Sequence, residues 1–130
     1  MRDTPWWLAI ALSGGLAVAL GAFAAHGLQG QLPARLLAAF ETGVRYQMWH
    51  TLAMLGVLAW RAGQPLRGQQ LTLGLWALGI VLFSGSLYAL ALSGIGRLGM
   101  ITPLGGVAFI AGWITLAVSA LRAQSASGST

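Results

Sequence analysis

The sequence contains no cysteine and no lysine, and its only acidic residues are Asp3 and Glu41. Without cysteine the chain forms no disulfide, holds no metal through thiolates and has no cysteine nucleophile. Charged residues make up 7% of the chain, whereas soluble domains typically carry about 25%. So few charges do not cover the surface of a water-soluble protein of this size, which argues against a soluble enzyme or binding domain.

Uncharged, largely apolar runs account for most of the chain. They cover residues 6–25, 46–60, 71–92 and 100–121. A helix needs about 20 apolar residues to cross a bilayer. Three runs have that length, and the second reaches it when extended back to residue 36. We therefore predict an all-α polytopic membrane protein, a compact bundle of four transmembrane helices over residues 6–25, 36–60, 71–92 and 100–121. The single membrane domain covers 1–130, with a flexible tail at 123–130.

The first apolar run has the features of a signal peptide, since Arg2 precedes it and Ala22-Phe23-Ala24 follows its core. It is longer than a usual signal core, so we interpret it as a retained helix. The second segment also allows two interpretations. Residues 34–46 form either an interfacial amphipathic helix that bends near Gly43 or part of one long tilted helix. We favour a continuous or mildly bent helix.

The net charge of +5 comes from seven arginines spaced singly near the ends of apolar runs. Such arginines extend toward phospholipid headgroups, so we expect membrane lipids, and no nucleic acid, as partners. With four spans, four arginines lie on the side of the termini and three on the other, which predicts that both termini are cytoplasmic. The first group is Arg2, Arg61, Arg67 and Arg122, and the second is Arg35, Arg45 and Arg97.

Small residues recur every four positions in the first run. Such a strip lets a second helix approach closely, although an Ala- and Gly-rich chain also produces it by chance. The predicted helix-packing positions are Ser13, Ala17, Gly21, Ala25, Gly85, Gly105, Gly106 and Gly112.

Polar side chains inside apolar spans are costly and so mark structural or functional positions. We predict an internal polar network near one membrane face, formed by His26, Glu41, Arg45, Tyr46, Gln47, His50, Ser84, Ser86, Tyr88 and Thr102. Glu41 and Arg45 are four residues apart, which predicts a neutralising ion pair. The functional alternatives are a proton relay and a lipid headgroup clamp. We expect Glu41→Ala to destabilise more than Arg61→Ala, because it leaves Arg45 unpaired in a poorly hydrated place.

The helical period separates two of these groups. At about 100° per residue, Gly43, Gln47 and His50 face one side of the second helix and Glu41 faces the other. This argues against an iron site made of His26, His50 and Glu41. We expect His50 to form hydrogen bonds inside the bundle, with Ser84, Ser86 or Tyr88, and we expect no metal and no cofactor.

Several motifs together resemble one known family. They are Gly21-Ala22-Phe23-Ala24-Ala25-His26-Gly27-Leu28, Phe40-Glu41-Thr42-Gly43-Val44-Arg45-Tyr46-Gln47-Met48-Trp49-His50, Phe83-Ser84-Gly85-Ser86-Leu87-Tyr88, and Ile101-Thr102-Pro103-Leu104-Gly105-Gly106 followed by Gly112-Trp113. Over residues 6–121 the sequence resembles the bacterial membrane protein family catalogued as domain of unknown function 423, related to the eukaryotic transmembrane protein 256. The resemblance implies a small multi-helix inner-membrane protein and no particular activity.

Three functions remain open. The first is a non-enzymatic membrane protein that binds lipid or a partner membrane protein through the polar network, as a homo-oligomer. The second is a small oligomeric transporter or channel that uses Glu41, Arg45 and His50. The third, a membrane enzyme acting on lipid or quinone, has the least support, because no nucleophile–base pair or ligand cluster is present.

Overall fold

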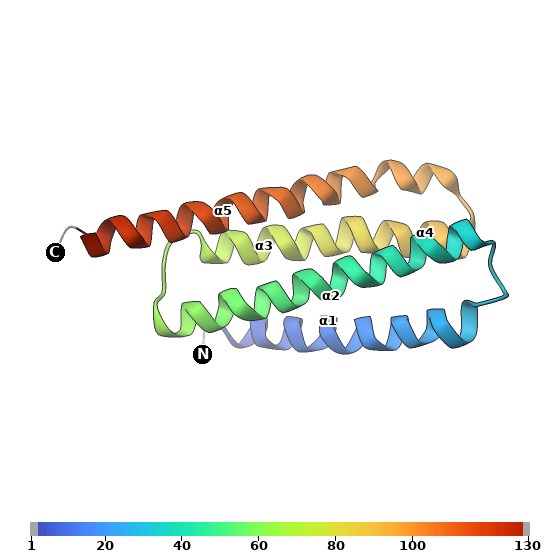
Figure 1. Cartoon of the computed structure of the whole chain (residues 1–130), viewed down its shortest axis with the longest axis horizontal. Coiled ribbons are helices and arrows are strands. Elements are labelled where there is room, and N and C mark those ends of the chain that lie inside the picture. The colour runs from blue at the N-terminus through green and yellow to red at the C-terminus, as the bar shows by residue number, and fades with distance from the viewer. Residues whose placement is uncertain (1–2, 129–130) are drawn as a thin grey trace.

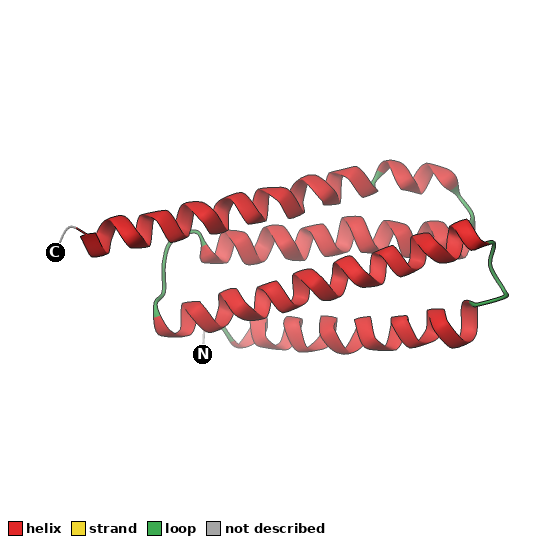
Figure 2. Ribbon diagram, in the orientation of Figure 1, coloured by secondary structure: helices red, strands yellow, loops and turns green. Residues whose placement is uncertain are grey.

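The computed structural model describes residues 3–128, without the side chains of 126 and 127, and all regular elements in that range are helical. Four long helical segments run antiparallel to their neighbours in one bundle (Figures 1 and 2). In chain order the elements are α1 (Thr4–Phe23), the π-helical turn η1 (Ala24–Leu28), α2 (Ala34–Gly63), α3 (Gln69–Gly79), the π-helical turn η2 (Ile80–Ser84), α4 (Gly85–Ser93), the 3-10 turn η3 (Gly96–Met100) and α5 (Thr102–Gly128). α1 begins and α5 ends at the same end of the bundle.

Three segments of the described chain are long and apolar enough to cross a membrane: Thr4–Leu28, Gln69–Ser93 and Gly96–Ser125. α2 is long enough, at 30 residues, but its charged and polar residues leave it outside this group. The prediction of a helical membrane protein is therefore confirmed for three spans, and composition alone does not identify the fourth.

Proline and glycine set several helix boundaries. Pro33 is the N-cap of α2, and its carbonyl accepts the N–H groups of Leu36 and Leu37 at 3.0 Å. Gly94 ends α4 with a φ of 73°, a conformation that glycine adopts without steric cost, and its N–H donates to Leu90 at 2.8 Å. The chain therefore reverses within short connections, which keeps neighbouring helices antiparallel.

The structure decides between the two interpretations of the second helix, and it describes most of the tail that was expected to be flexible. α2 is one continuous helix from Ala34 to Gly63, so the described chain has no interfacial break near Gly43. α5 continues to Gly128, so residues 123–128 of the predicted flexible tail are helical, while residues 129–130 lie outside the described residues.

The bundle has two apolar cores. One lies toward the end that holds the start of α1, and it consists of Ile10, Met54, Val57, Leu58, Leu73, Trp76 and Phe109. The other lies toward η1 and consists of Ala24, Leu28, Leu36, Phe40 and Ala91. The middle of α2, between these cores, contributes the buried polar side chains Gln47 and Thr51, and α1 contributes the partly buried Ser13.

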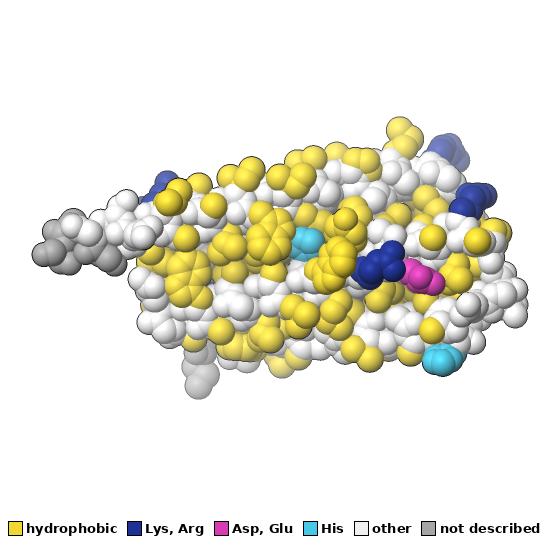
Figure 3. Space-filling model, in the orientation of Figure 1, with side chains coloured by type: hydrophobic (Ala, Val, Ile, Leu, Met, Phe, Trp, Pro, Cys, Tyr) yellow, Lys and Arg dark blue, Asp and Glu magenta, His cyan; other side chains and the backbone are white. Residues whose placement is uncertain are grey.

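The outer surface is apolar on every long helix. Leu12, Leu52, Val81 and Val107 are each more than half exposed, and hydrophobic side chains extend over the visible face (Figure 3). Soluble monomers rarely expose contiguous apolar surface of this extent. An apolar surface of this extent is compatible with the acyl chains of a membrane.

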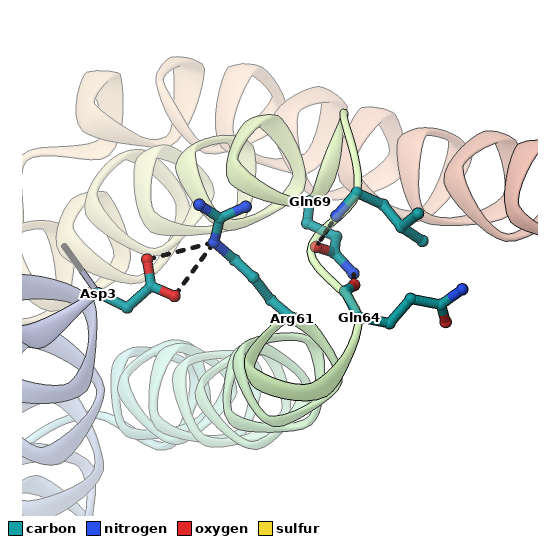
Figure 4. Close-up of polar contacts among 5 residues, drawn as sticks. Asp3, Arg61, Gln64 and Gln69 are labelled. Carbon is teal, nitrogen blue, oxygen red and sulfur yellow. Dashed lines mark hydrogen bonds and ion pairs between the residues drawn. The ribbon is translucent and has the colours of Figure 1, made fainter. Parts of the chain in front are cut away.

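Polar contacts hold three helices together at the end where α1 begins (Figure 4). Arg61, near the end of α2, donates from Nε to both carboxylate oxygens of Asp3 at 3.2 Å. Gln69 is almost fully buried; its Oε1 accepts the Leu66 N–H at 2.8 Å and its Nε2 donates to the Gln64 carbonyl at 3.1 Å. These contacts fix the loop at 64–68 and, with it, the position of α3 against α2.

Candidate functional site

Gln47 connects three helices in the middle of the bundle. Its Nε2 donates to the Ser13 carbonyl of α1 at 2.9 Å, and its Oε1 accepts from the Tyr88 hydroxyl of α4 at 2.7 Å. Thr51, one turn along α2, donates to the Gln47 carbonyl at 2.6 Å and lies 2.7 Å from the Ser13 hydroxyl. One amide side chain thus uses both its acceptor and its donor group to set the relative position of α1, α2 and α4.

His50 faces α5 instead of joining Gln47. The Trp113 indole N–H donates to His50 Nε2 at 3.1 Å, so Nε2 is the unprotonated nitrogen. Nδ1 therefore carries the proton, which it donates to the Tyr46 carbonyl at 2.9 Å. The imidazole also stacks on Phe109 with 3.7 Å between ring centroids. Both nitrogens are occupied, which leaves none to bind a metal or to receive a proton from solvent.

The predicted serine and threonine positions form two further separate contacts. Ser84 donates to the Gly43 carbonyl at 2.6 Å, which joins the π-helical turn η2 to α2. Ser86 donates to the Phe83 carbonyl at 2.9 Å, and its oxygen lies 2.5 Å from the Thr102 hydroxyl of α5. The contacts expected between His50 and Ser84, Ser86 or Tyr88 are therefore wrong.

The polar residues predicted to form one network instead form several separate contacts. Three of the predicted residues take part in none of these interior contacts. His26 is exposed on η1, and Glu41 and Arg45 lie on the outer face of α2. Tyr46 contributes its carbonyl to His50 and its ring to an aromatic cluster with Phe83 and Phe109.

Some interior polar contacts carry no signal in the local sequence. Thr72 of α3 pairs with Thr115 of α5 at 2.6 Å, and the Trp76 indole donates to the Phe109 carbonyl at 3.1 Å. The sequence does indicate the contact of Thr51 with Gln47, because Thr51 lies four residues after Gln47 and hence near the same helix face. Trp113 had none, because its pairing with His50 depends on how α5 is rotated against α2.

Over residues 3–128, every buried polar side-chain atom has a hydrogen-bond partner within the chain. No group of three metal-ligating side chains occurs in that described part.

The predicted packing residues divide into two groups. A β-carbon on Gly105 would meet the Phe83 backbone, and one on Gly112 would meet the Trp76 indole, so these glycines allow close helix contact. Around Gly85 and Gly106, in contrast, the described chain has no atom close enough to meet such a carbon, so the expectation of close packing there is wrong. In the first-run strip Ala17 is buried and Ser13 is bonded to Thr51, whereas Ala25 is exposed.

Glu41 and Arg45 form an ion pair on the lateral surface. Arg45 Nη1 lies 4.0 Å from Glu41 Oε2, and the two side chains are 53% and 45% exposed, respectively. Arg45 Nη2 also donates to the Thr42 hydroxyl at 3.3 Å. Figure 3 shows basic and acidic side chains adjoining on this otherwise largely hydrophobic face. This pair, unlike the interior groups, retains hydrogen-bonding capacity.

A hollow of about 310 Å³ lies beside the pair, between the end of α1 and the first half of α2. Its apolar wall consists of Gly21, Ala24, Ala25 and Val44, and its polar groups are Gln29, Glu41 and Arg45. Small side chains on α1 leave this space open next to the two charges.

Sequence comparisons identify the family. The chain matches the family described as "Protein of unknown function (DUF423)" over residues 20–106. The chain belongs to this family. No solved structure matches it.

Curated relatives of this family include three bacterial membrane proteins. The UPF0382 membrane protein of Haemophilus influenzae is 48% identical over 116 residues, which cover 89% of this chain and 93% of that protein. UPF0382 membrane protein YwdK of Bacillus subtilis is 50% identical over 109 residues, which cover 82% of this chain and 88% of that protein. UPF0382 inner membrane protein YgdD of Escherichia coli is 43% identical, with 86% of each chain covered. The resemblance noted from the motifs is confirmed.

The DUF423 segment contains the hollow and part of the interior contacts, because Ser13, which bonds Gln47 and Thr51, precedes it. Gln47, Tyr88, Glu41 and Arg45 all lie within residues 20–106, whereas Trp113, the partner of His50, lies beyond it. The names of these relatives state a membrane location and no activity. The function therefore has to be argued from the geometry.

Proposed function

We propose that this protein is a four-span bacterial inner-membrane protein that binds a membrane phospholipid on its lateral surface and has no catalytic role. The observation that carries the proposal is the half-exposed Glu41–Arg45 pair, which lies away from the bundle ends and beside a hollow.

The depth of this pair supports lipid binding. A β-carbon built on Gly21 would lie 3.4 Å from Val44, so this part of α2 is level with Gly21 of the first span. Gly21 lies seven residues before Leu28, or about 10 Å along the helix axis. The 25-residue segment Thr4–Leu28 is about 37 Å long and exceeds a hydrocarbon core of about 30 Å by only about 4 Å at each end. The pair therefore lies just inside the edge of the hydrocarbon core, where charges are costly unless a polar group covers them.

The position of α2 in the bundle supports a fourth span. α2 packs between α1 and the α3–α4 segment along its whole length (Figure 1). Its outer face carries exposed Trp49, Leu52 and Leu55 beyond the ion pair. A helix that lies parallel to three spans and has lipid-compatible residues on its outer face crosses with them. Four arginines of the sequence (Arg2, Arg61, Arg67 and Arg122) belong to the side of the termini and three to the other, which favours a cytoplasmic location for both termini.

Transport through the bundle receives less support. Aromatic rings of Tyr46, Trp76, Phe83 and Phe109 cluster at His50, and Trp113 beside it is 46% exposed. The buried polar groups of the described residues are bonded to one another, so no chain of free groups leads across. An enzyme acting on lipid receives still less, since His50 has no free nitrogen to act as a base.

The test is lipid retention. We expect protein purified in a mild detergent to retain about one phospholipid per chain, measured by native mass spectrometry and by phosphorus analysis. Arg45→Gln should reduce this occupancy, whereas Arg97→Gln, in the η3 turn and outside the hollow, should not. A lipid-free wild-type protein would exclude the function. Detection of a stoichiometric protein partner, or of a dimer in place of lipid, would mean that the surface around Glu41 and Arg45 binds that partner instead.

A further inference from the structure

We propose that the hollow beside Glu41 and Arg45 selects the phosphoethanolamine headgroup, with the phosphate on Arg45 and the ammonium on Glu41. This inference rests on the proposed lipid binding and names the class of lipid.

The two charges are adjacent but are not joined by a hydrogen bond. Their N–O distance of 4.0 Å exceeds the 2.7–3.2 Å range of such bonds. In the described structure Glu41 has no hydrogen-bond donor on its carboxylate, and the hydrogen bond of the Arg45 guanidinium goes to Thr42. A carboxylate that can accept several hydrogen bonds thus lies next to a guanidinium with unused donors.

A ligand carrying both signs of charge complements this pair. The phosphate of a phospholipid can accept two parallel hydrogen bonds from a guanidinium. The ammonium of the ethanolamine group, with its N–H donors, then meets the carboxylate of Glu41. Gln29, which also lines the hollow, adds an amide that can donate to phosphate oxygens.

Other common headgroups match less well. A choline group has no N–H and cannot donate a hydrogen bond to Glu41. A glycerol headgroup leaves the lipid anionic, so its phosphate on Arg45 faces an uncompensated carboxylate within a few ångströms. Selection among phospholipids therefore follows from Glu41, and affinity for phosphate follows from Arg45.

The same helix pair provides a surface for the acyl chains. Glu41 and Arg45 continue along one stripe of α2 into Met48, Leu52 and Leu55, at helical spacing. These three residues, with Trp7, Ala11 and Gly14 of α1, line an apolar groove of about 260 Å³. Only the Met48 end of the groove lies near the charges, because Gly14 is about 21 Å and Trp7 about 31 Å from Leu28 along the axis of the first span.

The test compares three lipids and two variants. Protein in nanodiscs or mild detergent is titrated with phosphatidylethanolamine, phosphatidylcholine and phosphatidylglycerol, and bound lipid is measured by native mass spectrometry. We expect wild-type protein to bind phosphatidylethanolamine about tenfold more tightly than the other two, the effect of about one charged hydrogen bond. Glu41→Gln should remove this preference while phosphate binding remains, and Arg45→Gln should weaken binding of all three lipids.

The control and the contrary outcomes separate the two proposals. Arg97→Gln, outside the hollow, should preserve both affinity and preference, and circular dichroism melting should show that all variants are folded. Equal binding of the three lipids by wild-type protein overturns the headgroup assignment and leaves the lipid-binding function intact. Absence of any bound lipid overturns both. A dimer that Glu41→Gln dissociates assigns the face to a second copy of the chain and also overturns the assignment.

Discussion

At the scale of single residues, the buried polar side chains act as specific connectors between helices. Gln47 is bonded to Ser13 and Tyr88, and His50 to Trp113, all across helix–helix interfaces. In hydrocarbon the helices gain little from apolar contact alone, so such bonds and close packing determine how they associate. Each connector therefore has a definite partner whose loss should be measurable.

Tyr88→Phe should lower the free energy of unfolding by about 1–2 kcal/mol, because Gln47 Oε1 then lacks its donor in a buried place. SDS titration of the protein in mixed micelles, followed by tryptophan fluorescence, measures this change. Tyr46→Phe is the matched control, since the structure of the described residues records no hydrogen bond from the Tyr46 hydroxyl. Equal effects of the two substitutions would mean that the bond to Gln47 contributes nothing specific.

The two ion pairs of the described residues differ in environment, and this reverses an expectation from the sequence. Asp3 and Arg61 are 23% and 16% exposed and lie within hydrogen-bond distance, whereas Glu41 and Arg45 are about half exposed and 4.0 Å apart. The Asp3–Arg61 pair loses hydrogen bonds when one partner is removed, whereas the Glu41–Arg45 pair has none between its members and is covered by a lipid headgroup in the proposed site.

Arg61→Ala should therefore destabilise the protein more than Glu41→Ala, by about 1 kcal/mol. The loss leaves Asp3 unpaired where the first residues of α1 meet the end of α2. Melting temperatures of the two variants in one detergent test the order. If Glu41→Ala melts lower, the lateral pair matters for folding more than its exposure indicates.

At the scale of elements, glycines determine how closely two helices approach. α5 contains the adjacent residues Gly105 and Gly106, which differ in what surrounds them. A β-carbon on Gly105 would meet the backbone of Phe83 in η2, which cannot move aside as a side chain end can. A β-carbon on Gly106 would meet no other part of the described chain. The approach of α5 to η2 thus depends on the first glycine and not the second.

Gly105→Ala should lower the free energy of unfolding by about 1–3 kcal/mol through overpacking. Gly106→Ala should be neutral or slightly stabilising, because alanine favours the helix more than glycine does. SDS unfolding of both variants measures the difference. Similar destabilisation by both substitutions would contradict the close contact between α5 and η2.

At the scale of the whole molecule, the antiparallel bundle places the connections at two opposite ends. The turn after η1 and the loop at 64–68 lie at opposite ends of α2 (Figure 1). They therefore lie on opposite sides of the membrane if α2 crosses it. The absence of native cysteine makes this directly testable, because an introduced thiol is the only one in the chain.

Gln31→Cys and Gln70→Cys should react differently with a membrane-impermeant maleimide, since both positions are exposed and lie at opposite ends of α2. We expect Gln31→Cys to be labelled in intact cells after outer-membrane permeabilisation, and Gln70→Cys only after lysis. The unsubstituted chain is the unlabelled control. Labelling of both from one side would exclude a fourth span, and the reverse pattern would place the termini outside.

The sequence by itself determined that the chain lies in lipid, that its segments are helical, and which face of α2 points inward. Long uncharged runs require lipid, prolines and glycines mark the turns, and the helical period places Gly43, Gln47 and His50 together; all three positions are buried. These properties are local, so composition and spacing are enough to predict them.

Only the tertiary structure decided the partners of the polar residues. The pairing of His50 with Trp113 and the link from Gln47 to Ser13 and Tyr88 depend on the rotation and axial offset of helices far apart in the chain. The same offsets leave Glu41 and Arg45 on the lateral surface beside an open hollow instead of inside the bundle. Sequence spacing predicts which residues share a face of one helix, but the packing of several helices decides what that face meets.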